Sequence, residues 1–244
     1  MEGKGIVIYN PVDFKKFNYK IDQCEARKAL NIPLDAKAIL YAGGYDAEIK
    51  GLHPFLLAMS KLVKKETHLA CLMPSFHFPP DPLKRQWTIK RRIGKVLGIY
   101  RKSDSLFSMT RRNDLFQHVI AVPFTRKMEQ WIAAADVVCV PHIKPHFSRT
   151  VMEAGAMKKP VVASRIGGVE EVVKDGETGL LVPSGDVQGL AVATEHLLNN
   201  PTLRKRLGEN GFAQALELFD ANKHIQSVER IYETFVTVSR HKRG

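Results

Sequence analysis

Residues 141–164, PHIKPHFSRTVMEAGAMKKPVVAS, lead from the end of one apolar strand through a loop and a helix into a second strand. The two strands, DVVCVP (136–141) and PVVAS (160–164), are continuous apolar runs without polar alternation. Such runs are typical of strands buried on both faces, as in a parallel sheet covered by helices. This segment therefore predicts one strand–helix–strand unit of an α/β protein.

The same alternation continues on both sides of this unit. Further apolar runs predict strands at GIVIYN (5–10), AILYAG (38–43), ACLMPS (70–75), HVIAVPF (118–124) and GLLVP (179–183). Helical spacing of apolar residues predicts helices at 52–65, 128–135, 150–157 and 187–200, and the region 201–244 predicts two more. Together the pattern predicts a single α/β domain over residues 1–244, built on a Rossmann-like, doubly wound parallel sheet.

The composition favours a folded protein with anionic partners. The chain has 244 residues, 44% of them hydrophobic, and a formal net charge of +12. No apolar run approaches the roughly 20 residues of a membrane-spanning helix, and the N-terminus lacks a secretory pattern, so we expect a cytoplasmic protein. The positive charge favours nucleic acid, an acidic membrane surface or phosphorylated ligands. The cysteines Cys24, Cys71 and Cys139 are scattered, which disfavours a zinc site.

A break in composition covers residues 74–117. It begins with the proline-rich stretch PSFHFPPDP and continues with basic residues from Lys84 to Arg112 that few acids balance. We expect an irregular basic insertion, either a solvated face or a patch that makes peripheral contact with an anionic membrane. Nucleic-acid binding is disfavoured because the sequence has no recognisable module and no interleaved aromatic residues.

The loop GGYDAEIKG (43–51) follows a predicted strand and precedes a predicted helix. Ligands of open α/β sheets bind beyond the carboxyl ends of strands, where such loops lie. Gly43 and Gly44 allow close approach to the backbone, and Lys50 can reach a phosphate as a point charge. The spacing is neither that of a P-loop nor GxGxxG, so a tight turn with a surface lysine stays open as the alternative.

The start of the helix within 141–164 predicts a second part of an anion site. Backbone N–H groups in the first turn of a helix have no partner inside the helix and attract anions. The residues at this helix start are Phe147, Ser148, Arg149 and Thr150. Glu153 follows about one turn later and is the only acid between Asp136 and Glu170. Its carboxylate is therefore placed to accept two hydrogen bonds from a vicinal diol such as a ribose.

In this order, these segments resemble the C-terminal domain of retaining glycosyltransferases of family 4 (group 1), which have the GT-B fold. VIYNPVDFKKF (7–17) resembles the entry into that domain, and GGYDAEIKG resembles its phosphate loop. The most specific matches are MEQWIAAADVVCVP (128–141), HFSRTVMEAGAMKKPVVAS (146–164) and GGVEEVVKDGETGLLVPSGD (167–186). The resemblance implies the C-terminal half of a GT-B architecture, with an N-terminal acceptor domain that this chain does not contain.

The resemblance also implies a hexosyltransferase-like enzyme and roles for matching residues. A sugar would move from a nucleoside diphosphate to an acceptor hydroxyl with retained configuration, without a metal or other cofactor. Lys50 and Glu153 would be the catalytic candidates, with Lys50 at the diphosphate and Glu153 at the ribose. The amides from Phe147 to Thr150 would hold the sugar–phosphate end, and the main chain at Val122 and Pro123 would line the base. A lysine and a helix start stabilise the negative charge of a departing diphosphate without a cation.

Two positions depart from the pattern of the family. The first glutamate of its E-x7-E motif falls on Pro145, and its phosphate-binding arginine falls on Gly44 or Tyr45. These losses leave a catalytically degenerate nucleotide-sugar-binding or regulatory module as the alternative function. With the other domain missing, we expect this chain to bind nucleotide without turnover.

Overall fold

The computed structural model describes residues 6–44, 49–75, 110, 115–122 and 124–241, and its side chains up to residue 234. Within the predicted insertion at 74–117, only residues 74, 75, 110 and 115–117 are described, and all the basic residues from Lys84 to Arg112 lie outside these ranges. Pro123 also lies outside them.

A parallel sheet of six strands forms the centre of the described structure, in the order β3-β2-β1-β4-β5-β6. Every neighbouring pair is parallel. The strands are β1 (Lys37–Tyr41), β2 (Leu69–Pro74), β3 (Val119–Val122), β4 (Val137–Val140), β5 (Val161–Arg165) and β6 (Gly179–Pro183). The predicted Rossmann-like α/β fold is confirmed, and these strands fall within a residue or two of the predicted apolar runs.

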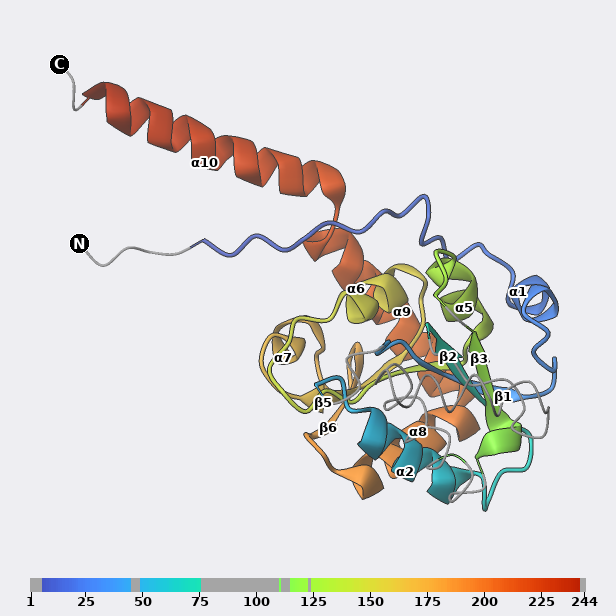
Figure 1. The fold of residues 1–244 in the computed structure, drawn as a ribbon. Helices are drawn as coiled ribbons and strands as arrows, with labels where there is room; N and C mark the ends of the chain where they lie inside the picture. Colours follow the sequence, from blue (N-terminus) through green and yellow to red (C-terminus); the bar gives the residue numbers. More distant parts are fainter. Residues whose placement is uncertain (1–5, 45–48, 76–109, 111–114, 123, 242–244) are drawn as a thin grey trace, which may run out of the picture.

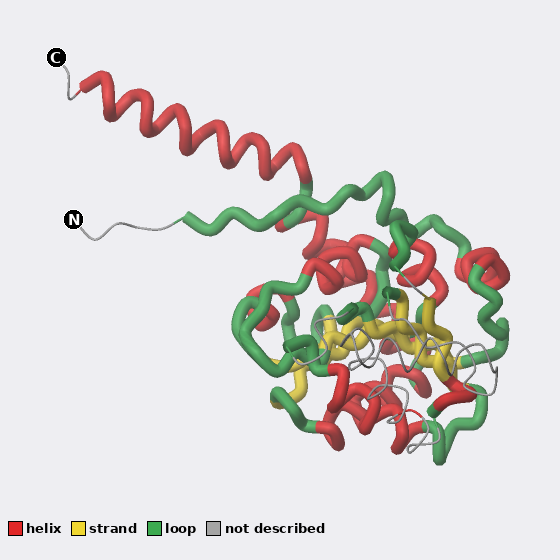
Figure 2. Tube along the Cα trace, viewed as in Figure 1, coloured by secondary structure: helices red, strands yellow, loops and turns green. Residues whose placement is uncertain are grey.

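Helices cover both faces of this sheet (Figures 1 and 2). Their bounds are α1 (Gln23–Ala29), α2 (Leu52–Leu62), α5 (Met128–Ala134), α6 (Arg149–Ala156), α7 (Val169–Val172), α8 (Val187–Asn199), α9 (Pro201–Leu218) and α10 (Ala221–His241), with a 3-10 helix η1 at Phe116–His118. Helices α2 and α8 pack on one face, and α1, α5, α6 and α7 pack on the other. Asp186, the N-cap residue of α8, accepts a hydrogen bond from Gly189 N at 2.8 Å.

The sheet separates two apolar cores, which explains the continuous apolar strands. Successive side chains of a strand point to opposite faces. Ala38 and Leu40 of β1 enter the core under α5 and α6, whereas Ile39 and Tyr41 enter the core under α2 and α8. Both faces of β1 therefore need apolar residues, and an alternating pattern would leave polar groups buried.

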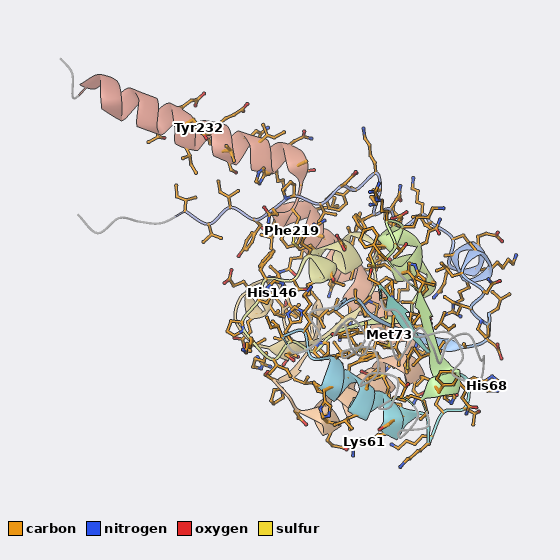
Figure 3. All side chains as sticks on the ribbon, in the orientation of Figure 1. Lys61, His68, Met73, His146, Phe219 and Tyr232 are labelled. Atoms are coloured by element: carbon orange, nitrogen blue, oxygen red, sulfur yellow. The ribbon has the colours of Figure 1, made fainter. Side chains whose placement is uncertain are left out.

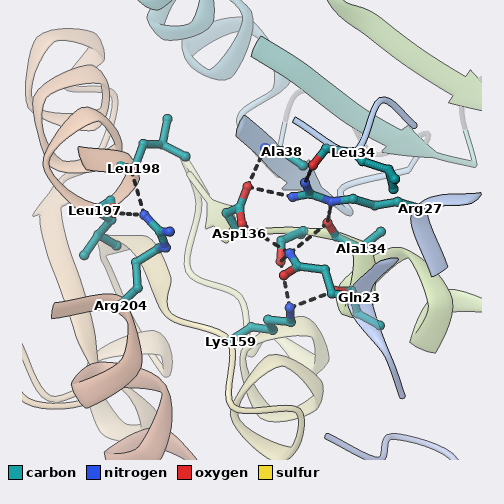
Figure 4. A network of polar contacts seen from close by, with 12 residues as sticks. Gln23, Arg27, Leu34, Ala38, Ala134, Asp136, Lys159, Leu197, Leu198 and Arg204 are labelled. Carbon is teal, nitrogen blue, oxygen red and sulfur yellow. Dashed lines mark hydrogen bonds and ion pairs between the residues drawn. The ribbon is translucent and has the colours of Figure 1, made fainter. Parts of the chain in front are cut away.

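A buried polar network joins α1 to the amino-terminal end of β4 (Figure 4). Asp136 accepts hydrogen bonds from Ala38 N and from the guanidinium of Arg27, both at 2.8 Å. Arg27 also donates to Ala134 O at 3.0 Å. Nearby, Lys159 donates to Ala133 O and Ala135 O at 2.7 and 2.8 Å, and burial lowers its pKa to about 8. These bonds fix the end of the sheet that carries the amino-terminal ends of the strands, opposite to their carboxyl ends.

The strand predicted at 5–10 is wrong. Residues 6–10 pair with no strand of the sheet, and Ile6 is 71% exposed. The segment lies instead against the junction of α9 and α10, where Val12 N donates to Phe219 O at 2.9 Å. The His224 ring nitrogen Nδ1 lies 2.9 Å from Tyr9 O. Apolar composition alone cannot show whether a sheet edge is free to accept another strand.

Helix α10 leaves the body of the molecule and projects away from the sheet (Figure 1). Tyr232, which lies about midway along it in Figure 3, is 69% exposed. None of the helices in the described ranges has both the length and the apolar character that crossing a bilayer requires.

Candidate functional site

A pocket of about 300 Å³ lies beyond the carboxyl ends of β1 and β4. In the strand order, β2 and β3 continue from β1 to one side, and β5 and β6 continue from β4 to the other. Ligands of open α/β sheets bind where the direction of the strand order reverses in this way. The pocket is lined by Asn10, Tyr41, Ala42, Gly43, Lys50, Cys139, Val140, Pro141, His142, His146, Phe147, Ser148, Arg149 and Thr150.

The segment that carries Lys50 is fixed against both strands. Tyr41 Oη donates a hydrogen bond to Lys50 O at 3.2 Å, and Ile143 N donates to Ile49 O at 2.8 Å. Gly51 has a φ of 72°, and a Cβ at this position would overlap the carbonyl oxygen of Pro141. The glycine therefore lets the lysine segment lie directly on the loop that follows β4. The Lys50 side chain is half-buried at the pocket wall.

The first turn of α6 forms the opposite wall. Ser148 is the N-cap residue, and its side chain makes no capping hydrogen bond. The first amides of α6 therefore have no partner from that side chain, and they give this wall the positive end of a helix. The predicted helix start next to Phe147 and Ser148 is confirmed.

The Gly167–Gly168 turn supports this wall from behind. A Cβ at Gly167 would meet Pro145 Cβ at 3.0 Å, and one at Gly168 would meet Phe147 Cδ2 at 3.1 Å. Phe147 also stacks on Tyr9, with ring centroids 5.7 Å apart. The absence of side chains at these two glycines therefore allows the turn to approach the 145–147 loop closely.

Glu153 lies one turn into α6. It is 8% exposed and is not among the lining residues. Arg149, which lines the pocket, donates to Glu153 Oε1 at 3.4 Å. Burial raises the pKa of the Glu153 carboxyl, and the nearby cations Arg149 and Lys16 partly oppose this increase. Lys16 comes from the N-terminal segment and was not anticipated from the sequence.

The structure thus brings most of the predicted site residues to one place. Gly43, Lys50 and the four residues from Phe147 to Thr150 share the pocket, and Gly44, with a φ of 57°, directly follows Gly43. Val122 ends β3, which β2 separates from β1, and it does not line this pocket. Pro123 lies outside the described residues.

Sequence reasoning missed two histidines in the loop after β4. His142 is 4% exposed, and its ring centroid lies 5.3 Å from that of His146. Both line the pocket. Their position directly after the Pro141 end of a predicted strand was the available signal. Within the described ranges, no cluster of three or more histidine, cysteine, aspartate or glutamate side chains could hold a metal ion.

Comparisons with known proteins identify relatives of this fold. The family model described as glycosyl transferases group 1 matches residues 36–200. A D-inositol 3-phosphate glycosyltransferase of Corynebacterium urealyticum is 30% identical over 241 residues, which are 96% of this chain and 52% of the relative. This chain therefore spans about half the length of that relative.

Solved structures also match almost all of this chain and about half of their own length. Sucrose-phosphate synthase from Thermosynechococcus elongatus matches with a TM-score of 0.72 and 26% identity, over 95% of this chain and 52% of that one. Anabaena HepE, solved in complex with UDP and glucose, matches with a TM-score of 0.78 and 23% identity, over 93% of this chain and 56% of that one. Both have the fold described above and extend well beyond the matched part.

Proposed function

Because the chain belongs to the glycosyl transferases of group 1, we propose that its pocket binds a nucleoside diphosphate sugar as the donor for sugar transfer. One observation carries this proposal. Lys50, from the loop after β1, and the first turn of α6, from the loop after β4, line the same pocket. A cation and a helix start that face one cavity suit a diphosphate.

The roles of the residues follow from this arrangement. Lys50 contacts the diphosphate, and the amides from Phe147 to Thr150 hold its sugar-linked end. Negative charge that develops on the departing diphosphate is stabilised by these fixed groups, so no metal ion is required. The main chain at Val122 and Pro123 lines the base. The reaction transfers a sugar to an acceptor hydroxyl with retained configuration.

Glu153 binds the ribose of the donor in this proposal. Its carboxyl accepts a hydrogen bond at 3.4 Å from Arg149, an exposed side chain that lines the pocket. The test compares UDP with its 2′,3′-dideoxy analogue. The wild-type chain should prefer UDP by about tenfold, and Glu153→Ala should lose this preference while keeping affinity for the dideoxy analogue. Equal preference in both proteins would remove Glu153 from the ribose site.

Pro145 motivates a second candidate function, a nucleotide-sugar-binding module without catalysis. A proline in place of a glutamate offers no side-chain hydrogen bond to the sugar. Sugar transfer by the full-length protein, assayed with candidate acceptors, separates an enzyme from a silent module. The 244-residue chain alone should bind the donor without transferring sugar, because the acceptor site belongs to a second domain of the same protein.

The region 1–244 forms one donor-binding domain in this proposal, and the longer protein works in the cytoplasm. The basic residues from Lys84 to Arg112 provide peripheral contact with anionic lipid. Co-sedimentation with anionic vesicles should fall when Lys90, Arg91 and Arg92 are replaced by glutamate. Unchanged co-sedimentation would remove the membrane part of the proposal and leave donor binding unaffected.

A thermal-shift experiment tests the main proposal. The chain is heated with UDP, GDP or ADP and with the matching sugar nucleotides. A ligand that binds only the folded state at about 100 times its Kd adds roughly 2.7 kcal/mol to the free energy of unfolding, which raises Tm by several degrees. If no nucleoside diphosphate raises Tm at millimolar concentration, the proposed function is wrong.

A further inference from the structure

A buried imidazole in the pocket wall has an unused hydrogen-bonding atom. Only 4% of the surface of His142 is exposed, and none of the described residues hydrogen-bonds its Nδ1. A buried polar atom without a partner destabilises the folded state by an amount comparable to a lost hydrogen bond. Such an atom at the wall of a ligand pocket marks a position where a ligand can supply the missing partner.

The main chain around His142 is fixed from two sides. Ser184 Oγ donates to His142 O at 3.0 Å, and Ile143 N donates to Ile49 O at 2.8 Å. The first bond comes from the loop after β6, and the second comes from the segment next to Lys50. The backbone that carries the ring is therefore fixed before any ligand arrives, which reduces the entropy that binding would otherwise cost.

The surroundings of His142 keep its ring neutral. Burial, with the nearby charges of His146 and Lys50, lowers its pKa to about 4, and a hydrogen bond with the main chain of His146 only partly opposes this shift. A neutral imidazole has one nitrogen that donates and one that accepts a hydrogen bond. A sugar hydroxyl can satisfy either nitrogen because it both donates and accepts, whereas a diphosphate oxygen only accepts.

We propose that His142 Nδ1 hydrogen-bonds a hydroxyl of the donor sugar and so helps to determine which sugar the pocket accepts. The inference rests on the proposed donor binding. It also accounts for the sugar contact that Pro145 cannot make, because Pro145 and His142 belong to the same loop after β4. His142 is then a specificity-determining residue that contacts the sugar, while Lys50 and the start of α6 hold the diphosphate.

The test measures Kd by calorimetry for UDP against UDP-glucose and for GDP against GDP-mannose, with the complete 244-residue chain. His142→Leu keeps the size of the side chain and removes both nitrogens. It should leave the Kd of the diphosphates within about twofold and weaken the preferred sugar nucleotide about tenfold, the loss expected for one hydrogen bond at a buried site. His142→Gln should recover part of this loss because its amide can donate and accept.

Three controls keep the outcomes separate. His53→Leu is the same substitution at an exposed position of α2 and should change neither Kd. Melting curves check folding: His142→Leu removes an unpaired buried atom, so its Tm should equal or exceed that of the wild type. If the leucine variant does not fold, the diphosphate Kd and the sugar-nucleotide Kd are compared in His142→Gln instead. An unchanged ratio of these two values then overturns the inference.

The inference is overturned if His142→Leu weakens the diphosphate and the sugar nucleotide equally, since that result places the contact on the diphosphate. An unchanged ratio of the two Kd values overturns it as well. A wild-type chain that binds each diphosphate as tightly as its sugar form would also overturn it, but would leave the proposed nucleotide binding intact. A wild-type chain that binds no nucleotide would exclude both.

Discussion

Among the described residues that line the pocket, Lys50 is the one lysine. Among the residues that the structure describes, its side chain forms no ion pair. A cation without a fixed carboxylate partner is available to an anionic ligand, and its contribution falls as salt screens it.

Lys50→Met should therefore weaken UDP binding about tenfold without lowering Tm, because a charge-assisted hydrogen bond to the ligand is lost and no ion pair with a described residue is broken. Calorimetry at low and high salt provides the measurement, and the salt dependence of Kd should be smaller in the variant. Lys61→Met, at an exposed position of α2, is the matched control. Wild-type affinity in Lys50→Met would exclude this lysine from the diphosphate site.

Glu153 has a measurable effect on stability through its pKa. Burial raises the pKa of this carboxyl in the folded state, so the folded protein binds the proton more tightly than the unfolded chain does. Ionised Glu153 therefore destabilises the fold at neutral pH, and this penalty disappears as pH falls below about 4.3, where the carboxyl is protonated in both states.

Glu153→Gln should accordingly have a higher Tm than the wild type at pH 7, and the difference should shrink as the pH approaches 4. Melting curves across this range, with Glu229→Gln on the exposed side of α10 as the control, measure it. A variant less stable than the wild type at pH 7 would show that the bond from Arg149 outweighs the burial of the charge.

At the scale of residues, the sequence predicted which residues share the pocket better than it predicted the burial and contacts of their side chains. Gly43, Lys50 and the start of α6 follow strands, and the carboxyl ends of parallel strands meet at one edge, so their sharing a pocket could be predicted. The burial of His142 could not, because it depends on contacts from Ser184 and Ile49 that are far apart in the sequence. The approach of Lys16 to Glu153 was hidden for the same reason.

At the scale of elements, one contact fixes the segment after β1 on the loop after β4. Gly51 combines a left-handed φ with a position where a side chain would overlap Pro141 O. Gly185 has a similar φ of 79° but has open space where its Cβ would stand. Substitutions at these two glycines therefore distinguish the cost of backbone strain from the cost of steric overlap.

Gly185→Ala should reduce the free energy of unfolding by about 1–2 kcal/mol, the strain of a left-handed non-glycine residue. Gly51→Ala should reduce it by more than about 3 kcal/mol, because the overlap adds to that strain. Urea unfolding of both variants provides the comparison. Equal losses would mean that the two loops can separate without cost, and the pocket would then be less rigid than described.

A strand or helix could be predicted from the sequence where its own residues determine it and contacts with distant segments matter little. Residues 136–164 encode a strand, a helix start and a strand locally, and all three are found. Residues 5–10 have the composition of a strand, but a strand exists only when it pairs, and this segment packs on α9 and α10 instead. The strand order, with β1 next to β4, is likewise a long-range property that no local pattern specifies.

At the scale of the whole molecule, α10 contributes little to the core. None of its described side chains is buried, whereas Leu207 in α9 is completely buried. Helix α10 and the N-terminal segment extend from the same side of the body in Figure 1, and Ile6 and Val7 of that segment are exposed.

A chain that ends at Asp220 should keep a cooperative unfolding transition and lose less stability than Leu207→Ala in the full chain. Because Leu207 is buried, that substitution should lower the free energy of unfolding by about 2–5 kcal/mol, with a corresponding loss of Tm. Calorimetric melting of both proteins measures the difference. If the truncated chain is the less stable one, α10 belongs to the fold more closely than its exposure indicates.

The strand order also affects how this protein reaches its native state. Ala38 N, at the start of β1, bonds Asp136, which is 98 residues further along the chain. Closing so long a loop is entropically unfavourable and slows folding, so the two walls of the pocket come together only when most of the sheet has formed. A nucleotide added during refolding should therefore leave the refolding rate unchanged and slow only the opposite process, the rate of unfolding.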